Sequence, residues 1–219
     1  MFDFILLLAG AGKRSGLSYN KIKYQVNNIA LYQYVIEEVK KSKYLDKIIL
    51  VVSKEDYQYF TDIKEYQDKR FIICLGGKER QDSVLNGIRK ACSDIVLVHD
   101  GARANVRCED IDKVYESVLK YDVACLGVKE KNAIKRVKDG FIRESIDRED
   151  VYLMQTPQGA KKKLLEEALE KIDHVVYDDV QAIKEVFDID AYLVLGREDN
   201  IKVTSEEDLE LIEYLLKRR

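Results

Sequence analysis

A glycine-rich stretch near the start of the chain is followed by three cations. Residues 4–26 read FILLLAGAGKRSGLSYNKIKYQV, an apolar run that leads into Gly10 and Gly12 and then into Lys13, Arg14 and Lys21. Glycines allow backbone N–H groups to approach a phosphate closely, and cations neutralise its oxygens. Such a loop suits reactions in which charge builds up on phosphorus. The alternative interpretation is a tight turn with solvated cations.

Two well-known phosphate-binding patterns do not fit this stretch. The dinucleotide pattern G-x-G-x-x-G has Ser15 in place of its third glycine, and no carboxylate stands at the ribose-binding spacing. A Walker loop needs Ser or Thr after its Gly-Lys pair, but here Arg14 follows, and Leu7 occupies the first glycine position. The sequence therefore disfavours a nicotinamide oxidoreductase and a Walker-type NTPase.

Further polar residues follow other apolar runs. In VLVHDGAR, Asp100 ends a buried strand, where a carboxylate either binds magnesium for nucleotide phosphates or forms an ion pair with Arg103. In GGKERQDSVLNG, Gly77 and Ser83 either contact a nucleotide base or cap a helix. Lys202 comes directly after the last apolar run and would bring a further cation to this edge.

The elements that must position these residues alternate between strands and helices. Apolar runs such as FILLLAG, KIILVVS, RFIICLGG and DIVLVHDGAR are separated by amphipathic segments such as ALYQYVIEEVKKS and RQDSVLNGIRKAC. This alternation predicts a doubly wound α/β fold with a mostly parallel sheet, as a single Rossmann-like domain over residues 1–219. Ligands of such sheets bind beyond the carboxyl ends of the strands, where the polar motifs stand.

A hairpin is predicted in the second half. Asp139 and Gly140 lie between two alternating apolar stretches in NAIKRVKDGFIRESI, and an Asp-Gly pair in that setting favours a tight turn. We expect a β-arm at about 130–150 that projects from the sheet. Its apolar positions need cover, and a second copy of the chain would supply it, so we expect a homodimer.

Composition excludes several classes of protein. The 37 basic and 40 acidic residues give a net charge of −3, which provides no broad basic surface for nucleic acid. No apolar run approaches the roughly 20 residues that span a bilayer. Since no signal peptide precedes the first strand, we expect a cytoplasmic protein without membrane contacts.

In this order, the motifs resemble those of the polyol-phosphate cytidylyltransferases, and most closely the 2-C-methyl-D-erythritol 4-phosphate cytidylyltransferase family. The resemblance covers nearly the whole chain. Its motifs are LAGAGKRSG, the NK of residues 20–21, GGKERQDSVLNG, VLVHDGAR, AIKRV, the DR of residues 147–148, QTPQ, YDD and DNIKVTSEEDL.

The resemblance implies transfer of CMP from CTP to 2-C-methyl-D-erythritol 4-phosphate (MEP), with release of pyrophosphate. It implies that Arg14 and Lys21 stabilise the transition state, that Lys202 contacts the phosphates, and that Asp100 positions Mg²⁺ or another divalent cation. By position, the nucleotide site would comprise Ala9, Gly10, Gly12, Gly77 and Ser83. The polyol phosphate site would comprise Arg103, Arg148, Thr156 and Asp178, with Arg148 reaching across the dimer from the arm.

The chain departs from the family pattern at several positions. Asn20 replaces the proline that usually precedes the catalytic lysine, while the spacing from Arg14 to Lys21 is kept. Ala133 and Tyr177 stand where the family has threonines expected near the substrate phosphate. The loss of a hydrogen bond to a charged group costs about 1.5 to 3 kcal/mol, so the second substrate is the more open question.

Two alternatives to the MEP enzyme remain from the sequence. Within the same class, a ribitol-5-phosphate or other alditol-phosphate cytidylyltransferase would supply cell-wall or capsule polymers. In a different class, the chain would be a nucleotide-binding module without catalysis. The joint retention of Arg14, Lys21, Asp100 and Lys202 favours an enzyme.

Overall fold

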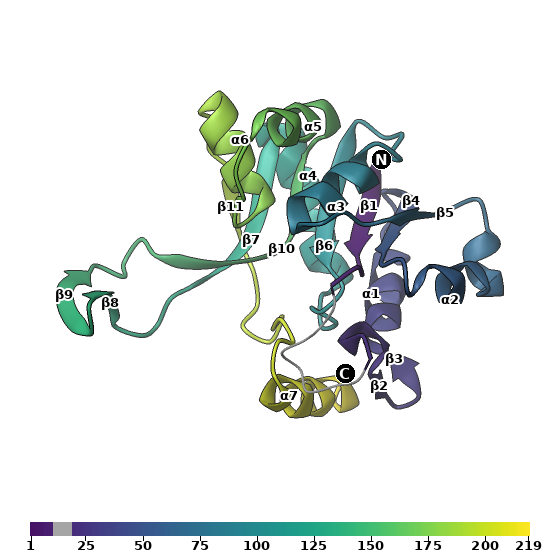
Figure 1. Cartoon of the computed structure of the whole chain (residues 1–219), viewed down its shortest axis with the longest axis horizontal. Coiled ribbons are helices and arrows are strands. Elements are labelled where there is room, and N and C mark those ends of the chain that lie inside the picture. The colour runs from purple at the N-terminus through teal and green to yellow at the C-terminus, as the bar shows by residue number, and fades with distance from the viewer. Residues whose placement is uncertain (11–18) are drawn as a thin grey trace.

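A seven-stranded sheet forms the centre of the molecule, in the order β11, β7, β10, β6, β1, β4, β5 (Figure 1). The computed structural model describes residues 1–10 and 19–219. Within these ranges, β10 alone in the sheet runs antiparallel to its neighbours, and the other pairs are parallel. The prediction of a mostly parallel α/β sheet is confirmed. The strands are β1 (Phe2–Leu7), β4 (Leu45–Val52), β5 (Phe71–Leu75), β6 (Ile95–Asp100), β7 (Val123–Lys129), β10 (Tyr152–Lys161) and β11 (Tyr192–Leu195).

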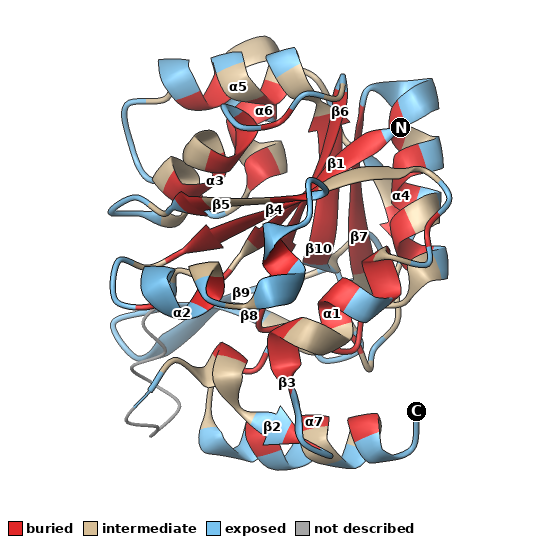
Figure 2. Ribbon diagram, turned by 90° about the vertical axis from the view of Figure 1, so that its right-hand side faces the viewer, coloured by how far each residue is buried: buried red, intermediate tan, exposed pale blue. Residues whose placement is uncertain are grey.

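Helices cover both faces of this sheet (Figure 2). On one face lie α1 (Leu31–Val39) and α4 (Cys108–Tyr121), and on the other α3 (Arg80–Ile88), α5 (Lys162–Lys171) and α6 (Asp179–Phe187). Successive strand residues point to opposite faces, so Phe4 and Leu6 join the first core and Ile5 joins the second. This two-sided burial explains why the strands read as continuous apolar runs.

Short elements complete the body. The turn η2 (Lys21–Lys23) is followed by β2 (Gln25–Val26) and β3 (Ile29–Ala30), which form a small hairpin. Beside them lies α7 (Glu206–Lys217), whose buried residues form a third core cluster with Val26 and Leu31. The short helices α2 (Tyr57–Thr61) and η3 (Lys64–Gln67) lie beyond β4. Among the described helices, none combines the length and apolarity needed to cross a membrane.

The predicted arm projects from the body of the molecule (Figure 1). It consists of β8 (Ile134–Lys138) paired antiparallel with β9 (Phe141–Ile146). Between them, Asp139 and Gly140 have positive φ angles of 54° and 80°, which the tight turn requires and which Gly and Asp tolerate. Phe141 and Ile142 are 65% and 68% exposed, so the arm carries apolar surface that the single chain leaves open to solvent.

Candidate active site

A cavity of about 500 Å³ opens at the carboxyl ends of β1, β5 and β6. Its lining comes from separate segments of the chain, because parallel strands end at one edge of the sheet. It brings together the predicted residues Ala9, Gly10, Lys21, Gly77, Ser83, Asp100 and Lys202. The predicted residues Gly12 and Arg14 lie outside the described residues.

Asp100 lies between two cations in this cavity. Lys202 Nζ is 2.6 Å from Asp100 Oδ2, and Arg80 Nε is 3.3 Å from Oδ1. Burial opposes ionisation of this carboxyl, but the charges of Arg80 and Lys202 outweigh it and hold the pKa well below its usual range. Asp100 is therefore an anion at neutral pH. Its ion pairs in the described structure are with Arg80 and Lys202, not with Arg103, the alternative that the sequence left open.

Arg80 is a site residue that the sequence analysis did not select. It begins α3, and its Nη1 and Nη2 donate to the two carboxylate oxygens of Asp179, each at 2.9 Å. This bidentate ion pair fixes the plane of the Arg80 guanidinium group, so that its Nε faces Asp100. The signals were an arginine directly after the GGKE turn and the second aspartate of the YDD motif.

Asp178, which the sequence analysis did select, has another position. Its Oδ1 accepts the Gln181 N–H at 2.9 Å and so caps α6, and its Oδ2 accepts from Gln158 Nε2 at 3.3 Å. It lines a second cavity of about 510 Å³, which also contacts Tyr152, near the base of the arm, and Tyr192 of β11. Asp178 therefore lines this second cavity and not the one lined by Lys21, and its contact with the polyol phosphate stays a prediction.

The glycine pair after β5 packs tightly against α3. A Cβ added to Gly77 would lie 2.2 Å from Asp82 Cβ, so no larger residue fits without a shift. The Gly77 N–H donates to Ser83 Oγ at 3.0 Å, and the Ser83 hydroxyl donates to the Glu79 carbonyl at 3.2 Å. The helix cap that the sequence offered as one alternative is made by Asp82, whose Oδ2 accepts the Glu79 N–H at 3.0 Å. The bonds of Gly77 and Ser83 tie the glycine turn to the start of α3. They also place Gly77 and Ser83 on the wall of the cavity, where contact with a nucleotide stays a prediction.

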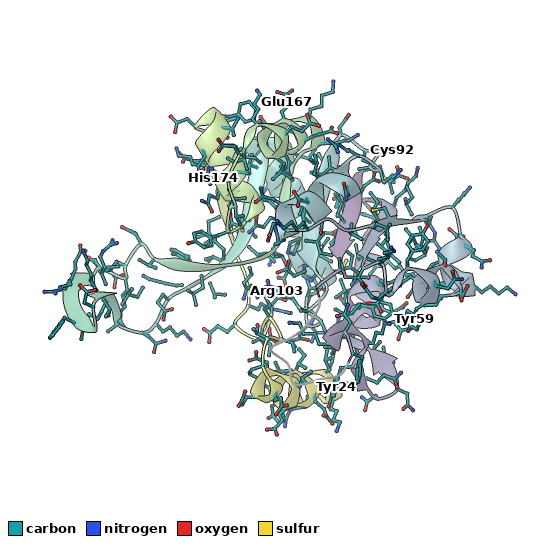
Figure 3. The ribbon with its side chains drawn as sticks, viewed as in Figure 1. Tyr24, Tyr59, Cys92, Arg103, Glu167 and His174 are labelled. Carbon is teal, nitrogen blue, oxygen red and sulfur yellow. The ribbon has the colours of Figure 1, made fainter. Side chains whose placement is uncertain are left out.

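The side chains of Arg103 and Thr156 are held near Asp100 by hydrogen bonds to backbone groups. Arg103 donates from Nη1 to the Asn200 carbonyl at 2.8 Å and from Nη2 to the Met154 carbonyl at 3.3 Å. Thr156 Oγ1 accepts the backbone N–H of Asp100 at 3.2 Å. Figure 3 labels Arg103 in the middle of the molecule, near the segment that leads to α7. Both residues thus connect the end of β6 with β10.

His99 fixes this junction as a neutral ring. Its Nε2 lies 3.1 Å from the Arg103 carbonyl, which can only accept, so Nε2 carries the proton and Nδ1 accepts from the Thr156 hydroxyl at 3.0 Å. Burial lowers the pKa of His99 to about 4. It therefore packs and orients rather than transferring protons at neutral pH.

Two further residues lie away from the cavity. Arg148 follows the arm, and its Nη1 donates to the Lys131 carbonyl. Tyr177 is 94% exposed, so in the single chain its phenol does not replace the missing threonine hydroxyl in the cavity. Whether Arg148 acts in the site of a second copy stays a prediction.

Asp100 is the carboxylate that the sequence predicted as a metal ligand, and Glu79 also lines the cavity. Within residues 1–10 and 19–219, no cluster of three or more His, Cys, Asp or Glu side chains could hold a metal ion. Magnesium is commonly bound by one or two carboxylates together with substrate phosphates and water. Asp100, anionic and on the cavity wall, fits a magnesium ion that arrives with a nucleotide.

The fold and this cavity, with a carboxylate and cations at the strand ends beside a glycine turn, define a nucleotidyltransferase of the α/β class. The family model "IspD: 2-C-methyl-D-erythritol 4-phosphate cytidylyltransferase" matches residues 3–218. The chain belongs to this family of cytidylyltransferases, which acts in isoprenoid synthesis by the non-mevalonate pathway. The resemblance seen in the sequence is confirmed.

Individual relatives agree with the family match. The chain is 32% identical over 223 residues to the 2-C-methyl-D-erythritol 4-phosphate cytidylyltransferase of Clostridioides difficile, covering 99% of this chain and 94% of the relative. It is 35% identical over 223 residues to that of Clostridium botulinum, covering 98% and 96%. The crystal structure of 4-diphosphocytidyl-2C-methyl-D-erythritol synthase from Anaerococcus prevotii matches with a TM-score of 0.87 at 30% identity, covering 100% of this chain and 96% of that one.

Proposed function

We propose that the cavity at the strand ends binds CTP and MEP and transfers the cytidylyl group between them, forming 4-diphosphocytidyl-2-C-methyl-D-erythritol and pyrophosphate. The observation that carries this proposal is the convergence of Lys21, Asp100 and Lys202 on one cavity from three distant segments. Family membership supplies the two substrates, and the convergence supplies a site for them.

The reaction is a displacement at the α-phosphorus of CTP. An oxygen of the MEP phosphate forms a new bond to this phosphorus, the bond to the β-phosphate oxygen breaks, and pyrophosphate leaves with the electron pair. The attacking phosphate is already an anion, so the step needs no general base. The barrier to this step comes from charge that builds up at the α-phosphoryl group. Lys21 and Arg14 stabilise that charge.

Lys202 and Asp100 serve the triphosphate. A magnesium ion held by Asp100 and the phosphates would neutralise charge on the triphosphate and its leaving group. Lys202, 44% exposed at its side chain and paired with Asp100, can turn toward a phosphate when nucleotide binds. Arg80 stays with Asp179 and keeps Asp100 in place.

The polyol phosphate site is built around the junction of β6 and β10. Arg103 and Thr156 lie next to Asp100 there, and we propose Asp178 and Arg148 as more distant contributors. The exposed apolar residues of the arm, Phe141 and Ile142, favour a dimer in which Arg148 reaches the site of a second copy.

The Lys21→Ala variant tests this assignment. Because the ammonium group matters most in the transition state, we expect kcat to fall by roughly 100-fold or more while CTP binding survives. Pyrophosphate release gives kcat, and calorimetric titration with CTP gives the affinity. Lys163→Ala, an exposed lysine on α5, is the matched control and should behave as wild type. Unchanged turnover in Lys21→Ala would refute the role of this residue.

A further inference from the structure

Asn20 directly precedes the proposed catalytic lysine, Lys21. Its backbone has a φ angle of −63° and a ψ angle of 120°. Proline locks φ at about −65°, so the backbone already has the conformation that a proline ring would impose. Asparagine has no ring to enforce this angle, and another restraint must do so.

Hydrogen bonds of the Asn20 side chain provide that restraint. Its Nδ2 donates to the Leu8 carbonyl at 2.8 Å and to Asp56 Oδ2 at 3.0 Å, while its Oδ1 accepts the Ile22 N–H at 3.4 Å. Leu8 is itself fixed to the sheet, because its N–H donates to the Val51 carbonyl at 2.8 Å. One amide therefore ties the end of the first strand to the turn that carries Lys21.

Asp56 makes this tie rigid. It is 8% exposed, follows β4, and accepts from the Lys23 ammonium group as well as from Asn20. Burial opposes its ionisation, but the hydrogen bonds from Lys23 and Asn20 lower its pKa below the usual value. Lys23 also lies 4.3 Å from the centre of the Tyr59 ring, which Figure 3 labels on the α2 side of the molecule.

The residues before and after Lys21 in the turn are thus both held in place. Asn20 is held by Leu8 and Asp56, and the side chain of Ile22 is 3% exposed in the core. Lys21, between them, lines the cavity with Asp100 and Lys202. A displacement of either neighbour would move the ammonium group relative to those residues.

We propose that Asn20 and Asp56 are positioning residues that hold the turn by hydrogen bonds and act on the reaction through Lys21. This inference rests on the proposed catalytic role of Lys21. It predicts that proline can substitute at this position, because the φ angle already suits it.

Steady-state kinetics of Asn20→Ala and Asn20→Pro test the inference. Misplacement of a catalytic group lowers kcat, so Asn20→Ala should lose about 10-fold in kcat. Its KM for CTP should stay within about twofold, because Lys21 acts mainly in the transition state. Asn20→Pro should keep kcat within about threefold of wild type. Asp56→Asn removes the charge that holds Lys23 and Asn20. Its kcat should lie between those of Asn20→Ala and Asn20→Pro.

Gln58→Ala is the matched control, since Gln58 lies on the neighbouring α2 helix and its amide donates a hydrogen bond of 2.7 Å to the carboxylate of Asp62, which follows that helix. It should leave kcat unchanged. A wild-type kcat in Asn20→Ala, or an Asn20→Pro variant as slow as Asn20→Ala, would overturn the inference. Thermal unfolding of each variant shows whether a loss of kcat reflects a loss of folded protein, and a kcat loss that vanishes on correction for folded protein would also overturn it.

The double variant Asn20→Ala/Lys21→Ala separates this inference from the proposed function. If Asn20 acts through Lys21, the double variant should be no slower than Lys21→Ala. Full additivity of the two losses would contradict the positioning role while leaving the role of Lys21 intact. A fully active Lys21→Ala variant would remove the proposed catalytic role of Lys21, and the inference with it.

Discussion

At the scale of residues, Asp100 has the most consequential environment in the cavity. The sequence predicted a functional carboxylate here because an acid at the end of a buried strand needs a cation. Which cation it contacts could not be predicted, because Arg80 and Lys202 are 20 and 102 residues away in the chain. Only the folded sheet brings them together. The same reason explains why the pairing of Arg80 with Asp179 was missed.

His99 gives a prediction that belongs to this scale. Its pKa of about 4 in the folded protein lies below the value of about 6.5 of an unfolded histidine. Between these two values the unfolded chain binds a proton that the folded chain does not, so the free energy of unfolding falls as the pH is lowered. The His99→Gln variant cannot titrate, and glutamine can still accept and donate a hydrogen bond.

Urea unfolding at pH 7 and at pH 4.5 measures the difference. The wild-type chain should lose more free energy of unfolding over this interval than His99→Gln does, by up to about 3 kcal/mol. Equal losses in the two proteins would contradict the buried neutral histidine. Thr156→Ser, which keeps the hydroxyl partner of the ring, is a suitable control and should follow the wild-type pH dependence.

At the scale of elements, the arm and β10 show what a local pattern can and cannot predict. The hairpin was predicted because its turn, Asp139 and Gly140, lies within the pattern itself. The antiparallel strand β10 was not, since it contains Pro157 and the buried Gln155 and Gln158 in place of an apolar run. These amides pair with distant backbone groups, which a local pattern does not reveal.

The proposed role of the arm leads to a complementation experiment. If Arg148 acts in the site of a second copy, Arg148→Ala and Lys21→Ala should each be nearly inactive alone. A mixed dimer would contain one site with both residues intact, so co-expression should restore roughly a quarter of wild-type activity. Pyrophosphate release by the co-purified proteins measures it. Activity no higher than that of the separate variants would show that Arg148 does not act across a dimer.

The exposed apolar residues of the arm provide a second test of the same element. Ile142→Asp places a charge on a side chain that is 68% exposed in the single chain, so it should leave the fold intact. In a dimer that covers this residue, the charge would be buried, and self-association should weaken by at least 10-fold. Light scattering coupled to size-exclusion chromatography gives the oligomeric state. An unchanged state would place the arm outside the interface.

At the scale of the whole molecule, the sequence predicted the α/β class, the sheet and the edge at which the cavity lies. These follow from the period of the apolar runs and from the rule that parallel strands end together. Which polar side chains contact one another depends on pairing between residues far apart in the sequence. These contacts became visible only in the folded chain. The family match and the convergence of Lys21, Asp100 and Lys202 agree on one reaction.

The most direct measurement of that reaction is pyrophosphate release from CTP with MEP and, in parallel, with ribitol 5-phosphate. Ala133 and Tyr177 stand in place of threonines that the resemblance places near the substrate phosphate. The identity of the second substrate is therefore the point that this measurement must decide. We predict magnesium-dependent turnover with a kcat/KM for MEP at least 10-fold above that for ribitol 5-phosphate. Equal turnover with the two alditol phosphates, or none with MEP, would contradict the proposed function.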